Sequence, residues 1–116
     1  MLARSDADDH RAVAPGICIR TLCFGSTTLM SELRLLHGHV LPRHSPRQEQ
    51  TGYLVSGHIA LTIGVETRDV TPGDSWRIAG GVEHGAEVLQ DSMAVEVLSA
   101  VREDHLPAAR ARPTRR

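Results

Sequence analysis

The stretch Gly38-His39-Val40-Leu41-Pro42-Arg43-His44-Ser45-Pro46-Arg47-Gln48-Glu49-Gln50 is the most informative part of this 116-residue chain. It contains two prolines and no regular apolar period, which predicts a long irregular connection between strands. Long loops inside compact domains are usually functional. The polar side chains of this stretch are therefore the first candidates for a site.

Short apolar segments lie on both sides of this stretch and indicate strands. Before it, residues 17–24 read as one strand, and Leu29, Ser31, Leu33 and Leu35 alternate with polar or long side chains over the next. After it, turn residues separate the predicted strands 50–56, 58–63, 67–70, 75–79, 86–89 and 93–98. About eight short strands without a helical period predict an all-β sandwich or closed barrel.

The composition suits one soluble globular domain, with 41% hydrophobic and 23% charged residues. We expect a flexible lead-in over residues 1–13, a barrel over residues 14–106 and an arginine-rich tail over residues 107–116. The tail reads as a solvated extension rather than a nucleic-acid surface. All 13 basic residues are arginine, which excludes Schiff-base chemistry on a lysine.

The cysteines and the hydropathy predict a cytoplasmic protein. Cys18 and Cys23 lie five residues apart in an extended segment, which would point their side chains to opposite faces, so we expect no disulfide. No apolar run approaches the roughly 20 residues of a membrane span. We therefore expect no membrane partner, and a basic tail without an aromatic platform gives no reason to expect a nucleic acid.

Two motifs in order carry a resemblance to a known family. In the first cupin motif a glycine precedes two histidines separated by one residue, then a carboxylate or amide ligand, then a glycine. The residues in register with it are Gly38, His44, Gln50 and Gly57. The second motif is matched by Pro72-Gly73-Asp74 and Gly81-Val82-Glu83-His84. The chain thus resembles the small single-domain cupins, which implies an all-β jelly-roll barrel, the double-stranded β-helix.

The resemblance also implies a metal site. Glu49-Gln50 and His84-Gly85-Ala86 are similar to a cupin group whose metal is held by three histidines and one glutamine. Here Pro46 stands where the second histidine is expected, and proline offers no side-chain ligand. His44, Gln50 and His84 would remain to hold a divalent Fe, Mn, Ni or Zn ion, with a metal-free pocket as the alternative.

The last strand implies catalytic residues. The chain resembles pectin-degradation cupins that open and ketonise unsaturated uronic acids, in which an Asp-x-Phe pair and a following arginine face the pocket. The matching residues here are Glu96, Leu98 and Arg102. Glu96 is then a candidate general base, unless it pairs with an arginine on the outer face. Arg102 would clamp a substrate carboxylate or remain solvated, and Leu98 would reshape the pocket.

Two aromatic residues near the motifs have open roles. Trp76 would stack on a planar ligand beside Pro46 and Leu98, or else pack in the core. Tyr53 is out of phase with Gln50, so it is expected to point away, toward packing or a dimer surface. The remaining histidines are predicted to be surface or packing residues rather than ligands: His10, His37, His39, His58 and His105.

The leading functional hypothesis is a metal-dependent enzyme that isomerises, opens or cyclises a small polar molecule, as a homodimer. In it, His44, Gln50 and His84 hold the metal while Glu96 moves a proton. Related cupins include polyketide cyclases and iron dioxygenases, so oxygen chemistry stays open. The competing hypothesis is a binding module without catalysis.

Overall fold

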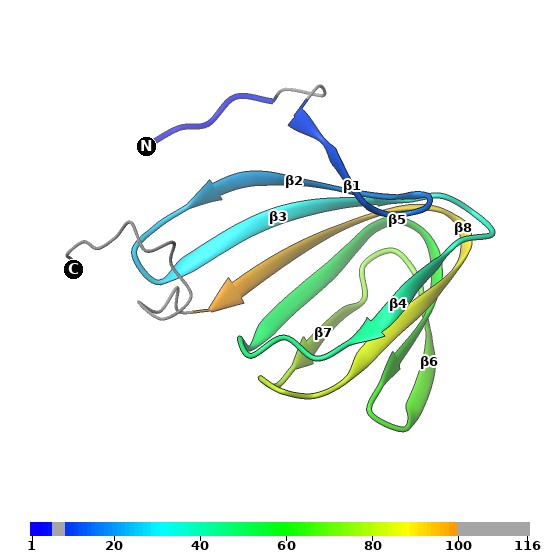
Figure 1. Cartoon of the computed structure of the whole chain (residues 1–116). Helices are drawn as coiled ribbons and strands as arrows, with labels where there is room; N and C mark the ends of the chain where they lie inside the picture. The colour runs from blue at the N-terminus through cyan, green and yellow to red at the C-terminus, as the bar shows by residue number, and fades with distance from the viewer. Residues whose placement is uncertain (6–8, 100–116) are drawn as a thin grey trace.

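The computed structural model describes residues 1–5 and 9–99, and over this part the chain forms strands and turns but no α-helix (Figure 1). The strands are β1 (Arg11–Ala14), β2 (Ile17–Phe24), β3 (Thr28–Leu35), β4 (Val40–His44), β5 (Gln50–Ile63), β6 (Glu66–Val70), β7 (Ser75–Ile78) and β8 (His84–Ser99). Arg102, His105 and the predicted tail lie outside the described residues. In the described part, no helix has the length and apolar character needed to cross a membrane.

All strand pairs are antiparallel, and the two longest strands connect the two halves of the barrel. One half has β1, β2 and β3 beside the C-terminal part of β8, followed by the N-terminal part of β5 and β7. The other half has β4, the N-terminal part of β8, the C-terminal part of β5 and β6. Figure 1 shows β5 and β8 curving between these halves. The predicted all-β barrel is confirmed.

A bend in β5 at Gly57 makes this curvature possible. Gly57 has a φ of 96°, and a Cβ atom there would lie 2.1 Å from Ser92 Oγ and 2.4 Å from the Asp91 carbonyl oxygen. The His58 N–H donates to Ser92 Oγ at 3.0 Å, and this hydroxyl donates to the Gln90 carbonyl at 2.6 Å. The bend therefore depends on a side chain being absent at position 57.

The predicted breaks near Gly57 and at residues 90–92 are thus bends within continuous strands. In β5 the buried residues are even-numbered before the bend, as Leu54 is, and odd-numbered after it, as Ile59 and Leu61 are. One extra residue at the bend shifts the alternation, as a β-bulge does. A prediction that relies on strict alternation of buried and exposed residues therefore divides β5 into two strands at the bend.

Two strands lie where the sequence predicted irregular chain. Strand β1 begins within the predicted lead-in, because Pro15-Gly16 forms the β1–β2 turn, with Gly16 at a φ of 73°. Strand β4 occupies part of the predicted loop, and its one partner among the described strands is β8. Pro42 is tolerated because the β4–β8 register shifts between Leu41 and His44, and proline is accepted at edges and bulges.

The core is aliphatic, in a chain that has only one Trp, one Tyr and one Phe. Its buried members come from both halves of the barrel: Ile17, Leu33, Leu35, Leu54, Ile59, Leu61, Val70, Ala86, Val88 and Ala94. Each lies on the inward-facing parity of its strand. Toward one end of the barrel the inner face becomes polar, with Ser31 on β3, Gln50 on β5 and His84 on β8.

Both cysteines are free, as expected, but the prediction that their side chains point to opposite faces is wrong. A register shift between Thr21 and Cys23 adds a residue to β2. Cys18 pairs with Arg34 and Cys23 with Met30, which places both cysteines on the outer face. The extra residue in the bulge shifts the alternation of β2, so both side chains point to the same face. They are kept apart by their distance along the strand.

We expect the Gly57→Ala variant to be strongly destabilised, by more than about 3 kcal/mol, because its Cβ would collide with backbone at a positive φ. Thermal unfolding followed by circular dichroism measures this. Gly25→Ala is the control, since the nearest atom to a Cβ there is Thr28 Oγ1 at 4.0 Å. A Gly57→Ala protein as stable as the Gly25→Ala protein would contradict this account of the bend.

Candidate active site and metal centre

Gln50 lies at the centre of the polar end of the barrel. It is the first residue of β5, is 3% exposed, and sits between Leu98 of β8 and Ile78 of β7. Its inward direction follows from the alternation with buried Leu54, and Tyr53 is correspondingly exposed, as predicted. A buried amide needs polar partners, which come from two different strands.

His84, the first residue of β8, is the first partner. Its ring is 2% exposed, and its Nε2 lies 2.9 Å from the Gln50 amide. On the other side of the ring, Nδ1 lies 3.1 Å from the Val82 carbonyl oxygen. Because a carbonyl only accepts, Nδ1 is the donor toward Val82, and Nε2 is the ring atom that faces Gln50.

His44 closes the site from the end of β4. It pairs with His84 in the sheet, and the two ring centroids are 4.3 Å apart with the planes tilted by 53°. Partial burial, and then the nearby His84, lower the pKa of His44 below its usual value. A lowered pKa favours the neutral imidazole, which is the form that ligates a metal.

Glu96 is the second partner of Gln50. Its carboxylate oxygens lie 3.2 and 3.3 Å from the amide nitrogen in the amide orientation that satisfies both groups. Burial raises the pKa of Glu96 to about 7. The sequence left open an inner or an outer position for this carboxylate, and the structure places it inside, next to Gln50.

The outer-face cluster of a carboxylate with arginines exists, but at Glu32. Its Oε1 accepts from His10 Nε2 at 2.9 Å and lies 3.7 Å from Arg20 Nε and 3.5 Å from Arg34 Nε. Burial would raise the pKa of Glu32, yet the His10 hydrogen bond and the two arginines outweigh it and lower the pKa. This cluster secures the N-terminal segment on the outside of the sheet.

The donors present fit a cation held by two imidazoles and an amide oxygen. The Nδ1–H of His84 is already bound to a backbone carbonyl, which is how ligating histidines are usually oriented. Pro46 adds no donor; instead its carbonyl accepts the Gly81 N–H at 2.8 Å and joins the two motif loops. No group of three His, Cys, Asp or Glu residues capable of holding a metal occurs within residues 1–5 and 9–99. The site is thus more open than a four-ligand cage.

Trp76 borders the same end of the barrel. It pairs with Gly52, which in turn pairs with Glu96, so the three positions form one row across β7, β5 and β8. A Cβ on Gly52 would lie 2.2 Å from the indole, so the ring occupies the space that a side chain would take. The indole Nε1 is buried and has no hydrogen-bond partner among the described residues.

The profile of the cupin domain matches residues 31–101. This chain belongs to the cupin family. The cupin shares 26% identity with KdgF from Halomonas sp., with a TM-score of 0.81 over 91% of this chain and 98% of that one. No curated protein matches its sequence.

Two less similar structures share the fold. An RmlC-like cupin from Shewanella frigidimarina is 22% identical, with a TM-score of 0.77 over 88% of this chain and 94% of that one. Salicylate 1,2-dioxygenase from Pseudoaminobacter salicylatoxidans, in complex with gentisate, is 16% identical, with a TM-score of 0.72 over 74% of this chain and 26% of that one. The cupin is thus close in length to the first of these and spans about a quarter of the second.

The other described histidines of this cupin have partners outside the site. The His39 ring packs against Gly16, and His58 Nε2 lies 3.5 Å from Asp69 Oδ1. His10 binds Glu32, and His37 is exposed. None of these contacts involves the candidate donors, in keeping with the surface and packing roles predicted for them.

Sequence reasoning missed two elements of the site. The Val82 carbonyl is a backbone atom, so no side-chain pattern shows it, although it lies only two residues before the motif histidine. Ser31 is 1% exposed and pairs with Glu96 across β3 and β8. The sequence did contain a sign of Ser31, because this small polar residue occupies an inward position between Leu29 and Leu33.

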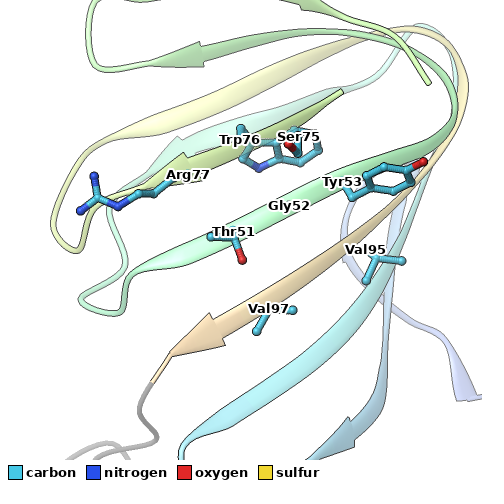
Figure 2. A pocket seen from close by; sticks show the side chains of 8 residues that line it. All are labelled: Thr51, Gly52, Tyr53, Ser75, Trp76, Arg77, Val95 and Val97. Carbon is cyan, nitrogen blue, oxygen red and sulfur yellow. The ribbon is translucent and has the colours of Figure 1, made fainter. Parts of the chain in front are cut away.

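A separate groove lies on the outer face of β5, β7 and β8 and has a volume of about 540 Å³ (Figure 2). Most of its wall consists of outward-facing residues of these strands, and the indole of Trp76 lines it where Gly52 has no side chain. The lining residues are Thr51, Gly52, Tyr53, Ser75, Trp76, Arg77, Val95 and Val97. Because Gln50 and Glu96 have the opposite parity, this groove is distinct from the site.

The raised pKa of Glu96 predicts a pH-dependent stability. Between the ordinary carboxyl pKa of 4.5 and about 7, the native state holds a proton that the unfolded state has released. Stability therefore falls as the pH rises through this window. In metal-free protein, Glu96→Gln should become more stable than wild type above it, by on the order of 2 kcal/mol.

Denaturant unfolding at about pH 5 and about pH 8 measures this difference. The exposed Glu87→Gln on the same strand serves as the control and should follow wild type. A Glu96→Gln stability that tracks wild type at both values would show that the carboxylate is not held in a desolvated place.

Proposed function

We propose that this cupin is a metal-dependent enzyme that isomerises or opens the ring of a small polar organic molecule. The observation that supports it is the Gln50 amide, which contacts His84 on one side and Glu96 on the other. Candidate metal donors and a candidate proton carrier thus share one end of the barrel, where Gln50 and His84 are buried and His44 is exposed. That arrangement suits reactions at a carbonyl or enol carbon.

His44, Gln50 and His84 would hold the metal, a divalent Fe, Mn, Ni or Zn ion. When bound, such an ion supplies Lewis-acid polarisation of a carbonyl or enol oxygen. The neutral form of His44, favoured by its lowered pKa, prepares one ring for that role, and the contact of Nδ1 with Val82 orients Nε2 of His84 toward Gln50. The amide contributes an oxygen without adding charge.

Glu96 would move the proton. A carboxyl group with a pKa of about 7 is able to accept a proton and return it near neutral pH, as general acid–base catalysis requires. The unpartnered Nε1–H of Trp76 would donate a hydrogen bond to a substrate oxygen, and Leu98 would limit the apolar side of the pocket. Arg102 remains a proposed carboxylate clamp outside the described residues.

Unsaturated uronic acids are the first substrates to test. They combine a carboxylate with an enol ether whose ring opening needs proton transfer, which is the chemistry that the last-strand resemblance implies. The similarity to KdgF over nearly the whole chain supports starting there. The change to Glu96 and Leu98 from the Asp-x-Phe pattern leaves room for a different small carbonyl compound.

A metal-free binding module is the second candidate, and Pro46 favours it. The site has one imidazole fewer than the related group, which lowers metal affinity. In that case His44, His84 and Glu96 would line a polar pocket that captures a ligand by hydrogen bonds. The two free cysteines support a reducing compartment for either candidate, so we propose a cytoplasmic location.

Metal binding separates these candidates. Purified without a chelating tag, wild-type protein should carry about one equivalent of a transition metal by mass spectrometry. His84→Ala should lose it. Pro46→His should bind at least about tenfold more tightly than wild type in a chelator competition, because it restores an imidazole donor. Pro46→Ala is its control.

Activity is then measured on the loaded protein. NMR of an unsaturated uronate should show ring opening by wild type and a loss of about 100-fold or more with Glu96→Gln, which has no basic group. If the protein binds a metal and does not open the ring, but consumes oxygen in the presence of aromatic acids, its function is that of a dioxygenase. Absence of metal after loading would leave the binding module.

The outer groove is the proposed homodimer surface. Three apolar or aromatic side chains on this face are well exposed, Tyr53 at 49%, Val55 at 45% and Met30 at 38%. Met30 pairs with Val97 and Tyr53 with Val95, so these side chains continue across β3, β8 and β5. A second copy would cover a continuous apolar patch of this kind.

Light scattering after size exclusion should give twice the chain mass for wild type and the monomer mass for Tyr53→Glu, because a buried carboxylate opposes association. Val65→Glu is the matched control, since Val65 is 99% exposed at the β5–β6 turn. Monomeric wild-type protein at high concentration would remove this surface from the proposal.

A further inference from the structure

The Gln50 amide has two ends, and its surroundings distinguish them. One end lies 2.9 Å from His84 Nε2, and the other lies 3.2 and 3.3 Å from the two oxygens of Glu96. Gln50 is 3% exposed, so water does not replace a lost partner easily. Which end faces which partner therefore matters energetically.

In its ionised form, the carboxylate of Glu96 accepts hydrogen bonds and donates none. If the amide oxygen faced it, two acceptors would oppose each other at about 3.2 Å. With the nitrogen facing Glu96, both carboxylate oxygens receive an N–H, and the amide oxygen turns to His84. Hydrogen bonds to a charged acceptor are the stronger kind, which adds to this preference.

His84 reinforces the same direction. Its Nδ1 faces the Val82 carbonyl, so Nε2 is the ring atom that meets the Gln50 oxygen, at 2.9 Å. Without a metal, Nε2–H donates to that oxygen; a bound cation would take the place of this hydrogen and meet one lone pair on each atom. The His44 ring, with its centroid 4.3 Å from that of His84, borders the same point.

We propose that Glu96 is a positioning residue for the metal ligand Gln50: by accepting the amide N–H, it turns the amide oxygen toward His84 and His44, where a cation is bound. This inference rests on the metal site of the proposed function and adds a role for Glu96 that is separate from proton transfer. A backing carboxylate of this kind fixes a ligand as partners beyond the direct ligands do in other metal sites.

The test uses two substitutions of Glu96 that differ in one property. Glu96→Gln keeps an oxygen that accepts the Gln50 N–H, whereas Glu96→Leu keeps the size and removes the acceptor. Titration calorimetry with Zn²⁺ and Mn²⁺ on the metal-stripped full chain should show Zn²⁺ affinity about 10- to 100-fold weaker for Glu96→Leu. Glu96→Gln should stay within a few-fold of wild type although its catalysis is lost.

Glu87→Leu is the matched control, because it removes one negative charge from an exposed position of the same strand. Side-chain amide NMR of Gln50 adds a readout that needs no metal. In wild type and Glu96→Gln the two amide protons should exchange slowly with water, and in Glu96→Leu at least tenfold faster. Circular dichroism verifies that each variant is folded.

The outcomes separate this inference from the proposed function. Equal Zn²⁺ affinity and equal amide exchange in folded Glu96→Leu and wild type would overturn the positioning role while leaving the metal site intact. Wild-type protein that binds neither ion overturns the metal site, and the amide exchange rates then still decide whether Glu96 orients Gln50. Weaker binding by Glu96→Gln and Glu96→Leu alike would reduce Glu96 to a charge effect and overturn positioning.

Discussion

The close approach of Gly57 to the β8 backbone is the constraint on which the rest of this barrel depends. Strands β5 and β8 pair along nearly their whole length, and each belongs to both halves of the sheet. Such a ladder closes only if it bends sharply, and the bend brings the backbones together where a Cβ would lie 2.1 Å from Ser92 Oγ. The Ser92 hydroxyl then satisfies the polar groups that the bulge frees. The glycine of the first motif is thus explained by packing rather than by chemistry.

The same bend assembles the site. Gln50 and Glu96 belong to the half formed by β3, β8, β5 and β7, whereas His44 and His84 belong to the half that contains β4. The 2.9 Å contact between Gln50 and His84 therefore spans the two halves, 34 residues apart in sequence. A buried polar contact of this kind opposes any slip in register, because a one-residue shift would turn Gln50 outward. The fold and the candidate site depend on the same β5–β8 ladder.

The sequence predicted most of the strands, and it selected His44, Gln50 and His84, which the structure brings together, because motif spacing and period two are local properties. It predicted less wherever an extra residue changes the alternation, at Gly57 in β5 and before Cys23 in β2. Pro42 hid an edge strand, because proline is a breaker only where a partner needs its N–H. The inward position of Glu96 was compatible with parity, yet its contact with Gln50 depends on barrel closure. No local pattern encodes the distance between two halves of a folded sheet.

The identity of residue 50 follows from its neighbour. The first cupin motif accepts a carboxylate or an amide at this position, and the two differ in what they tolerate nearby. A carboxylate at position 50 would stand about 3.2 Å from that of Glu96 in a buried place, where like charges repel strongly. An amide removes the repulsion and replaces it with a hydrogen bond, at the cost of a neutral ligand. With Pro46 in place of a histidine, the candidate site offers two imidazoles and one amide, and Glu96 is the carboxylate in contact with that amide. A metal held by these proposed donors would keep several positions exchangeable, which favours a substrate that itself completes the coordination.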